Sequence, residues 1–414
     1  MRRVPPWAAV VYAAALAARL AFLFMADQPL LYTHQYHYFQ SALRIAANPH
    51  PVHYVLTSEE WRTWNEQWTI APLYHLLGGL VFRVLGPHLL PLRVLQCALE
   101  AAAAVGVAAL GRRVAGPRGA WAGIAYAVYW PAVEMPSWTL TENLHTPLLV
   151  GGAALLALEP ERRPGRVALL AGVLLGLGAL TRSVTTGFLG LAVLWLLWRG
   201  VRLRGGRPWR VALAPALLLA LGGAAVILPW TARNAFLIGD PVLIETTAFE
   251  NIWFANAFVD RERFLRQQHV VHGQPTPAAK RAAALHFAWR GVTRRPGMFV
   301  EKVRLNFWHF LRPEGLHNLL RVERSQERWR HLGSLLLDDP LLLACLAPLL
   351  AFLVAGPPSR ARALIALWLG YYLLMVIVVF HNEIRYRSAF IPFAFAGAAG
   401  GLAAFARLER RRAA

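Results

Sequence analysis

The chain has little of several things on which other classes of protein depend. Its two cysteines, Cys97 and Cys345, both lie in apolar runs, so we expect no disulfide framework. Its only lysines are Lys280 and Lys302, and arginine therefore supplies nearly all of the positive charge. No clear small-residue cleavage site follows the first apolar segment, which ends at Met25, so we interpret this segment as a retained membrane anchor.

Apolar residues and positive charge are what the chain has in excess. Of its 414 residues, 57% are hydrophobic, against roughly 45–50% in a soluble domain, which indicates an integral membrane protein. The formal net charge is +21, and the basic residues fall mostly in short loops between apolar runs, as expected for the orientation signal of membrane helices. This distribution favours anionic and phosphate-bearing lipids as partners and argues against nucleic acid.

Apolar stretches that approach the length of a membrane span, about 20 residues, recur along the whole chain. The basic clusters between them predict about ten spans, with both termini in the cytoplasm. These spans are residues 7–25, 90–110, 120–136, 141–158, 167–180, 186–198, 211–230, 340–354, 364–380 and 389–405. Parity requires the short segment 72–86 to dip into the membrane or to lie at its surface; if it crosses instead, the topology after it inverts. The predicted fold is an all-α polytopic transmembrane helix bundle, forming a single domain over residues 1–414.

Two polar segments are predicted to lie on the outer side of the membrane. The first outer loop, residues 27–71, is dense in aromatic and ionisable side chains, and we expect it to carry the functional site. The second, residues 231–339, contains two stretches with apolar residues at helical spacing, 278–293 and 298–311. Arg295-Pro296-Gly297 separates them as a helix stop, so the spacing predicts two amphipathic helices on the membrane surface.

Ionisable residues at the ends of several spans gather on the same predicted outer side. Such residues are costly in a membrane and tend to line cavities, and guanidinium forks match phosphate oxygens. A single arginine of this kind is equally well explained by contact with lipid headgroups; several of them together with Glu142 favour a phosphate-binding site. The substrate-binding candidates from these ends are Arg182, Arg233, Asn234, Glu383, Arg385, Tyr386 and Arg387.

Several short pieces recur in a fixed order along nearly the whole chain. They are Tyr38…Ala42, Ala71-Pro72-Leu73-Tyr74, Arg93-Val94-Leu95-Gln96, Leu140-Thr141-Glu142-Asn143-Leu144, Leu180-Thr181-Arg182-Ser183, Leu228-Pro229-Trp230-Thr231-Ala232-Arg233-Asn234, Arg294-Arg295-Pro296-Gly297-Met298-Phe299 and Arg385-Tyr386-Arg387. This ordered set resembles bacterial membrane glycosyltransferases of the GT-C class, specifically the protein-mannosyltransferase and aminoarabinose-transferase-like superfamily (glycosyltransferase family 39-like). The resemblance says little about the substrate.

The resemblance implies a sugar transfer on the outer face of the bacterial cytoplasmic (inner) membrane. The donor would be a polyprenyl-phosphate sugar, and the acceptor a lipid, a glycan or a protein. Tyr38 and Tyr74, which lie in the matching pieces, join His37 as further substrate-binding candidates. In an inverting transfer, a base removes the acceptor proton, the hydroxyl attacks the anomeric carbon, and arginines stabilise the departing lipid phosphate.

The general base is the point at which this chain departs from the family. Family members place an acidic residue just after the first span, and this position falls at about His34-Gln35, where neither residue is acidic. One alternative makes His34 or His37 the base. Another assigns the base to a later carboxylate, for which the candidates are Glu59, Glu60 and Glu66, while Glu142 would orient the acceptor.

A metal ion and a non-enzymatic role are the remaining alternatives. The resemblance permits a divalent metal ion, but the spacing of histidines and glutamates in the first loop matches no tight zinc pattern, so we assign no metal ligands. The missing acid would also fit a membrane component that binds or moves lipid-linked sugars without catalysis. Transporters usually show internal repeats, and the sequence shows none, so we favour the transferase.

Overall fold

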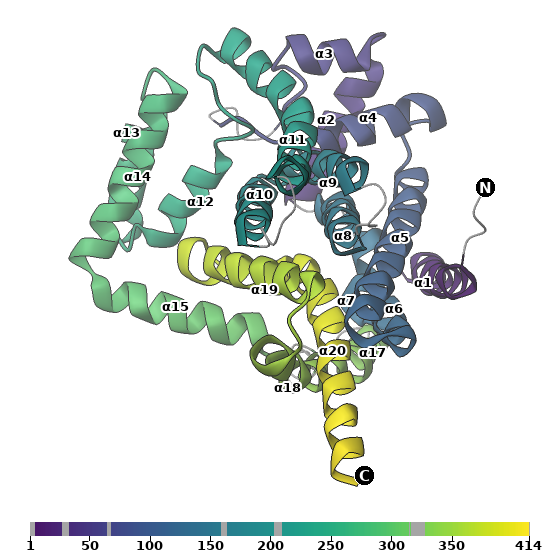
Figure 1. Cartoon of the computed structure of the whole chain (residues 1–414). Helices are drawn as coiled ribbons and strands as arrows, with labels where there is room; N and C mark the ends of the chain where they lie inside the picture. Colours follow the sequence, from purple (N-terminus) through teal and green to yellow (C-terminus); the bar gives the residue numbers. More distant parts are fainter. Residues whose placement is uncertain are drawn as a thin grey trace.

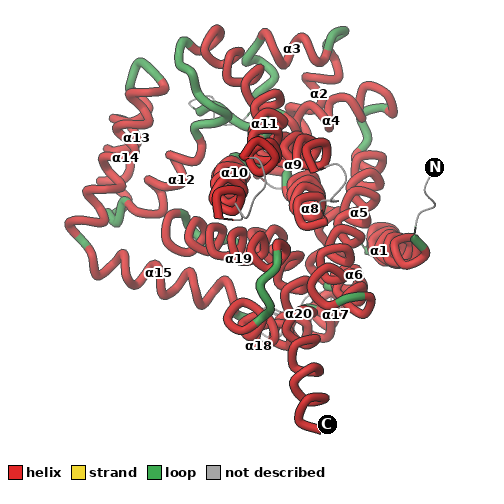
Figure 2. The backbone as a smooth tube through the Cα atoms, viewed as in Figure 1, coloured by secondary structure: helices red, strands yellow, loops and turns green. Residues whose placement is uncertain are grey.

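The computed structural model describes residues 5–26, 33–63, 68–158, 164–202, 209–313, 315 and 328–413, which form helices and connecting loops without a strand (Figures 1 and 2). The first helices are α1 (Pro6–Met25), α2 (Thr33–Ala47), α3 (Pro51–Thr57), α4 (Leu73–Leu85), α5 (Leu89–Ala115), η1 (Pro117–Ala120), α6 (Trp121–Val128), α7 (Trp130–Glu134), η2 (Met135–Ser137), α8 (Glu142–Leu158), α9 (Pro164–Ala179) and α10 (Val184–Arg202). The later ones are α11 (Trp209–Ile238), α12 (Thr247–Asn256), α13 (Arg261–His272), α14 (Pro277–Arg294), α15 (Pro296–Leu311), α17 (Arg328–Leu337), α18 (Asp339–Ala355), α19 (Arg360–Leu373), η3 (Leu374–Val379), η4 (Ile384–Tyr386) and α20 (Arg387–Ala413). The predicted all-α bundle is confirmed.

Within the described ranges, six helices are long and apolar enough to cross a membrane, so the chain is a multi-pass membrane protein. They are Pro6–Met25, Leu89–Ala115, Leu213–Ile238, Leu332–Ala355, Arg360–Val379 and Ile384–Arg407. Leu73–Leu85, Gly165–Ala179 and Val184–Arg199 are shorter apolar helices. The segment 72–86 thus forms a short helix, and the total of about ten spans stays a prediction.

The predicted span 120–136 is not one continuous helix. The helix α6 ends at Val128, and the chain restarts as α7, in which Pro131 occupies the first turn. Proline has no backbone N–H and its ring clashes with the carbonyl four residues earlier, so Ala127 loses its helical hydrogen bond. Arg19 of α1, itself fully buried, donates to that carbonyl oxygen at 3.2 Å. A charged residue in the first apolar segment therefore repairs a break more than 100 residues away.

Glycines set how closely α9 and α11 approach one another. A Cβ atom added to Gly172 would lie 2.2 Å from the backbone oxygen of Leu219, and one added to Gly222 would lie 2.3 Å from that of Leu169. Close backbone approach through small residues is a general mode of packing between membrane helices. The turn that follows α9 and leads into α10 contains Arg182, so the packing of α9 on α11 helps to fix the position of this residue.

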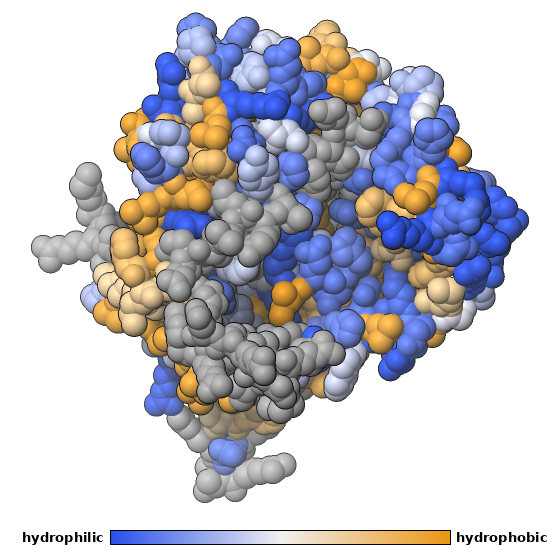
Figure 3. Space-filling model, turned by 180° about the vertical axis from the view of Figure 1, so that it is seen from behind, coloured by the Kyte–Doolittle hydropathy of each residue, from blue (hydrophilic) through white to orange (hydrophobic). Residues whose placement is uncertain are grey.

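The helices α12 to α15 extend from one side of the bundle (Figure 1). The predicted helices 278–293 and 298–311 are confirmed as α14 and α15, and the chain breaks between them at Arg295-Pro296. Seen from behind, the flank that carries α13 and α14 is mainly hydrophilic (Figure 3). That these helices lie on a membrane surface stays a prediction.

Side chains from α12 and α15 bind the carbonyl groups at the end of η3, a π-helical turn that follows α19. Asn256 donates to the oxygen of Val379 at 2.9 Å, and Lys302 donates to the oxygen of Val378 at 2.6 Å. Lys302 also donates to the Asn256 side chain at 2.9 Å. The final carbonyls of a helix lack helical partners, so these contacts fix the start of the segment 380–386.

Candidate functional site

A cavity of about 560 Å³ lies where six parts of the chain meet. These parts are α2, the segment 70–75 that leads into α4, Thr141 just before α8, the turn between α9 and α10, α12 with the loop before it, and the segment from α19 to η4. The wall contains both ionisable groups and apolar side chains, the latter including Phe254, Met375 and Phe380. Pockets with a largely apolar lining and a few convergent polar groups are the usual form of ligand sites.

Glu142 and Arg182 form a buried ion pair beside the cavity. Glu142 lies in the first turn of α8 and its side chain is 2% exposed, while that of Arg182 is 24% exposed. Thr141 donates to the Glu142 carboxylate at 3.1 Å. The Arg182 guanidinium also lies over the ring of Tyr386, 4.9 Å from its centroid. A buried carboxylate is stable only when charged or hydrogen-bonding groups contact it, and Arg182 and Thr141 do this for Glu142. The ion pair in turn fixes the position of Arg182, part of which reaches the cavity.

Arg385 brings a second guanidinium to the same place. Its Nε atom lies 2.5 Å from Glu383 Oε2 and 3.6 Å from Glu142 Oε1. Burial raises the pKa of Glu383, but the hydrogen bond from His381 and the charge of Arg385 outweigh it and lower that pKa to about 2. Glu383 therefore stays ionised near neutral pH and orients Arg385, so two predicted arginines and two predicted carboxylates form one network.

His34 and Gln35, at the position where the family has an acidic residue, have different surroundings in the structure. His34 lines the cavity. Burial and the nearby charge of Arg385 lower the pKa of His34 below its usual value of 6.5, so the imidazole is neutral near pH 7. Gln35 is buried, and its side-chain oxygen accepts a hydrogen bond from the backbone N–H of Thr139 at 3.1 Å. The residue with acid–base chemistry thus faces the cavity, and its neighbour anchors the helix.

The other aromatic candidates of the first outer loop lie at different depths. Tyr38 lines the cavity, and its ring packs edge-on against that of Tyr74 with the centroids 5.3 Å apart. Burial raises the pKa of Tyr38 to about 12, so its hydroxyl stays protonated. Tyr74 is buried behind it and donates to Gln96 Oε1 at 2.5 Å. His37 lies one turn from His34 on α2 but does not line the cavity.

A second group of predicted site residues gathers around Glu59, apart from the lining of the cavity. Glu59 forms ion pairs with Arg62 and Arg233. The Arg233 guanidinium lies 4.5 Å from the ring centroid of Trp230, and Asn234 donates to the oxygen of Val242 at 2.9 Å. This group joins the first loop to the end of α11.

Neither Glu60 nor Arg387, two further predicted residues, lines the cavity. Glu60 is exposed, and its backbone oxygen accepts a hydrogen bond from Arg44 at 2.8 Å. Glu66 lies outside the described residues. Arg387 is buried and donates to the backbone oxygens of Phe310 at 2.7 Å and His309 at 3.1 Å. The structure therefore gives Arg387 backbone partners, whereas Arg385, two positions earlier, reaches the cavity.

Residues that sequence reasoning missed complete the wall. Glu245, before α12, lines the cavity and accepts hydrogen bonds from the Ser183 backbone N–H at 3.3 Å and from Thr247 Oγ1 at 2.7 Å. Glu250 and Asn251 of α12 also line it. Their sequence signal was a stretch of threonine, glutamate and asparagine within the long segment 231–339, which identifies no partner by itself.

The described residues contain no group of three or more His, Cys, Asp or Glu side chains arranged to hold a metal ion. The carboxylates of the cavity are engaged instead by guanidinium, imidazole and hydroxyl groups, as the contacts of Glu142, Glu383 and Glu245 show. The residues described here do not fit a divalent ion, and we assign no step to one.

Solved structures of known proteins share this architecture, although no sequence match accompanies it. No family model matches the chain, and no curated protein matches it in sequence. Among solved structures, the oligosaccharyltransferase AglB from the archaeon Archaeoglobus fulgidus, in complex with an inhibitory peptide and a dolichol-phosphate, matches with a TM-score of 0.56 at 14% identity, over 99% of this chain and 51% of that one. An Archaeoglobus fulgidus oligosaccharyltransferase in complex with Zn and sulfate matches with a TM-score of 0.55 at 13% identity, over 97% of this chain and 50% of that one. ArnT from Cupriavidus metallidurans, bound to undecaprenyl phosphate, gives 0.43 at 13% identity, over 97% and 78%.

The chain spans about half the length of the archaeal structures that it matches. At this level of identity the likeness concerns the fold. The chain therefore has the fold of the GT-C glycosyltransferases, which agrees with the resemblance found in the ordered sequence pieces.

Proposed function

We propose that this protein transfers a sugar from a polyprenyl-phosphate donor to an acceptor at the outer face of the bacterial cytoplasmic membrane. The observation that carries the proposal is the pair of guanidiniums, Arg182 and Arg385, that line a cavity within a GT-C fold. The charge pattern between the apolar helices supports the outer location.

The arginine pair suits the phosphate of the donor. Both side chains are only partly exposed, at 24% and 19%, so their charges act where water screens them little. Glu142 and Glu383 hold them before any ligand arrives. Preorganised cations stabilise negative charge that develops on a leaving phosphate, because they need little reorganisation during the reaction.

The other residues that line the cavity suit the lipid tail and the sugar of the donor. The apolar side chains of Phe254, Met375 and Phe380 offer a surface to the lipid tail. Glu245 and Asn251 supply acceptors and donors for sugar hydroxyls. The donor thus finds a partner for its lipid, its phosphate and its sugar within one cavity.

We assign the general base to His34. Neutral imidazole accepts a proton from the acceptor hydroxyl while that oxygen attacks the anomeric carbon and the bond from this carbon to the phosphate oxygen breaks. The proton moves to His34, and the electron pair of the broken bond stays on the lipid phosphate beside Arg182 and Arg385. The lowered pKa of His34 keeps the base unprotonated at neutral pH.

The test compares His34→Gln with His37→Gln in purified membranes supplied with a panel of radiolabelled polyprenyl-phosphate sugars. Both substitutions remove an imidazole from α2, but only His34 lines the cavity. We expect transfer to fall by about 10² to 10⁴-fold in His34→Gln, the usual contribution of a general base, with donor binding retained, and to persist in His37→Gln.

Other outcomes separate the alternatives. Normal transfer in His34→Gln removes His34 as the base and directs the search to the other ionisable groups of the lining, His381, Glu245 and Glu250. Donor binding without transfer from any sugar in the panel would favour a protein that binds or moves lipid-linked sugars. Absence of both binding and transfer would refute the proposed function.

A further inference from the structure

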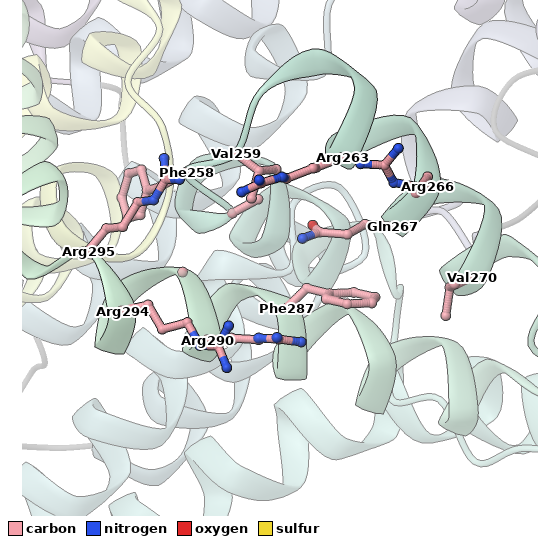
Figure 4. Close-up of a pocket in the computed structure, with 12 residues that line it drawn as sticks. Phe258, Val259, Arg263, Arg266, Gln267, Val270, Phe287, Arg290, Arg294 and Arg295 are labelled. Atoms are coloured by element: carbon pink, nitrogen blue, oxygen red, sulfur yellow. The ribbon is translucent and has the colours of Figure 1, made fainter.

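A second cavity, of about 550 Å³, lies where α12 ends and α13 and α14 meet. Figure 4 shows that arginine side chains of α13 and of α14 extend into this cavity, with the ring of Phe287 beside them. Its arginines are Arg263, Arg266, Arg290, Arg294 and Arg295. None of them belongs to the site described above, and the transfer mechanism uses none of them.

The positive charge of this second cavity is only partly compensated. Arg263 and Arg266 pair with Asp260 and Glu262 of the same helix turn. In the part of the chain that the structure describes, Arg290, Arg294 and Arg295 form no ion pair with a carboxylate. Like charges that share one hollow repel each other, and an anion bound between them relieves that repulsion.

Close packing and an unusual backbone fix the floor of the second cavity. A Cβ atom added to Gly291 would lie 2.0 Å from the backbone oxygen of Asn256 and 2.7 Å from that of Ala257, so α14 touches the end of α12 directly. Phe258, the next residue, has a φ of 46°, the one positive value recorded for a non-glycine residue in the described ranges. Such conformations persist where the surroundings enforce them and often mark ligand sites.

Exposed apolar and aromatic residues lie on α14 and on α15, the two helices that meet at Arg295. On α14, Trp289 is 71% exposed and sits next to Arg290 in sequence; on α15, Val300 is 65% and Trp308 is 60% exposed. Tryptophan beside arginine at the border of an apolar surface is typical of the membrane–water interface. The surroundings therefore favour an anion held at a membrane over one that arrives from solution.

We propose that the second cavity binds the phosphate group of an anionic membrane lipid. Guanidinium forks bind phosphate oxygens in pairs, and Arg290 and Arg294, one helical turn apart, present two such forks on one face of α14. The bound headgroup lies at the end of α12, the helix that lines the first cavity with Glu250 and Asn251.

The experiment measures equilibrium binding of radiolabelled phosphatidylglycerol to the purified full chain in neutral detergent, with phosphatidylcholine and inorganic phosphate as comparison ligands. The test variant is Arg290→Gln/Arg294→Gln. The charge-matched control is Arg261→Gln/Arg281→Gln, which removes two charges from the same pair of helices outside the cavity lining. Thermal unfolding of each variant verifies that it is folded, which we expect because both test arginines are exposed.

We expect the dissociation constant for phosphatidylglycerol to rise on the order of 30-fold in the test variant, as the loss of two arginines near a lipid headgroup predicts, and to stay near the wild-type value in the control. Equal weakening in both variants would mean a diffuse surface field and overturn the proposal. So would unchanged binding in the test variant. If inorganic phosphate bound as tightly as the lipid, the assignment to a membrane lipid would be overturned. Sugar transfer plays no part in this measurement, so its result is independent of the proposed function.

Discussion

Arg385 and Arg387 stand two positions apart, and the structure predicts opposite consequences when each is replaced by glutamine. Arg385 lines the cavity, whereas Arg387 binds the backbone at the end of α15. In Arg385→Gln, Glu142 keeps its ion pair with Arg182, and Glu383 keeps its hydrogen bond with His381 at 3.0 Å. No carboxylate is left without a partner, so we expect this variant to fold normally.

The size of each effect follows from the contacts. A hydrogen bond to a charged group contributes roughly 1.5–3 kcal/mol. Glu383 already offsets part of the charge of Arg385, so we take about 2 kcal/mol from this range, or about 30-fold weaker binding of a polyprenyl phosphate. Arg387→Gln instead deprives backbone oxygens of Phe310, His309 and Arg312 of their donor. The glutamine amide recovers part of these three hydrogen bonds, so the folded state should lose at least about 2 kcal/mol.

The assay pairs two measurements on each variant in detergent: equilibrium binding of a radiolabelled polyprenyl phosphate, and thermal unfolding followed by tryptophan fluorescence. Arg385→Gln should lose binding at an unchanged unfolding temperature. Arg387→Gln should unfold at a lower temperature and, below it, bind the lipid as the wild type does. The assignment of Arg385 to the phosphate fails if its variant binds with wild-type affinity, or if both variants lose binding to the same extent.

Two further results are expected. The rate of transfer should hold down to about pH 6.5 and decline only in more acid solution, because burial and Arg385 lower the pKa of His34 and the base works in its neutral form; a decline that begins well above pH 6.5 would contradict this role. Gly172→Ala should destabilise the fold by about 1–3 kcal/mol, because its Cβ would meet the backbone of α11 at 2.2 Å, while Gly190→Ala, which meets nothing within 4 Å, should be neutral or slightly stabilising. Equal unfolding temperatures for the two alanine variants would show that close packing of α9 on α11 is not needed.

The sequence was informative wherever a property belongs to a single residue or to a regular repeat. Apolar runs predicted the helix bundle, and helical spacing with a Pro-Gly stop predicted α14 and α15 within a few residues of their observed ends. The cost of placing charge in a membrane drew attention to Glu142, Arg182 and Arg385, which the fold brings together.

Contacts between residues far apart in the chain could not be predicted from single residues or regular repeats. Nothing in the sequence next to Arg19 indicates the carbonyl that it binds in α6. Likewise, Arg233 looks equivalent to Arg182 in the sequence, yet it pairs with Glu59 away from the cavity lining. Ala127, whose carbonyl Arg19 binds, is 108 positions from it, and Glu59 is 174 positions from Arg233, so only packing brings these residues into contact.

By itself, the sequence determined that this is a multi-pass helical membrane protein with arginines and carboxylates at the ends of its helices, because hydrophobicity and charge act residue by residue and recur with the period of a helix. Only the tertiary structure decided that Arg385 faces the cavity while Arg387 binds the end of α15, that His34 lines the cavity while Gln35 anchors its helix, and that Glu245 completes the wall. Neighbours in a chain point in different directions, and the partner that each one meets depends on how the helices pack.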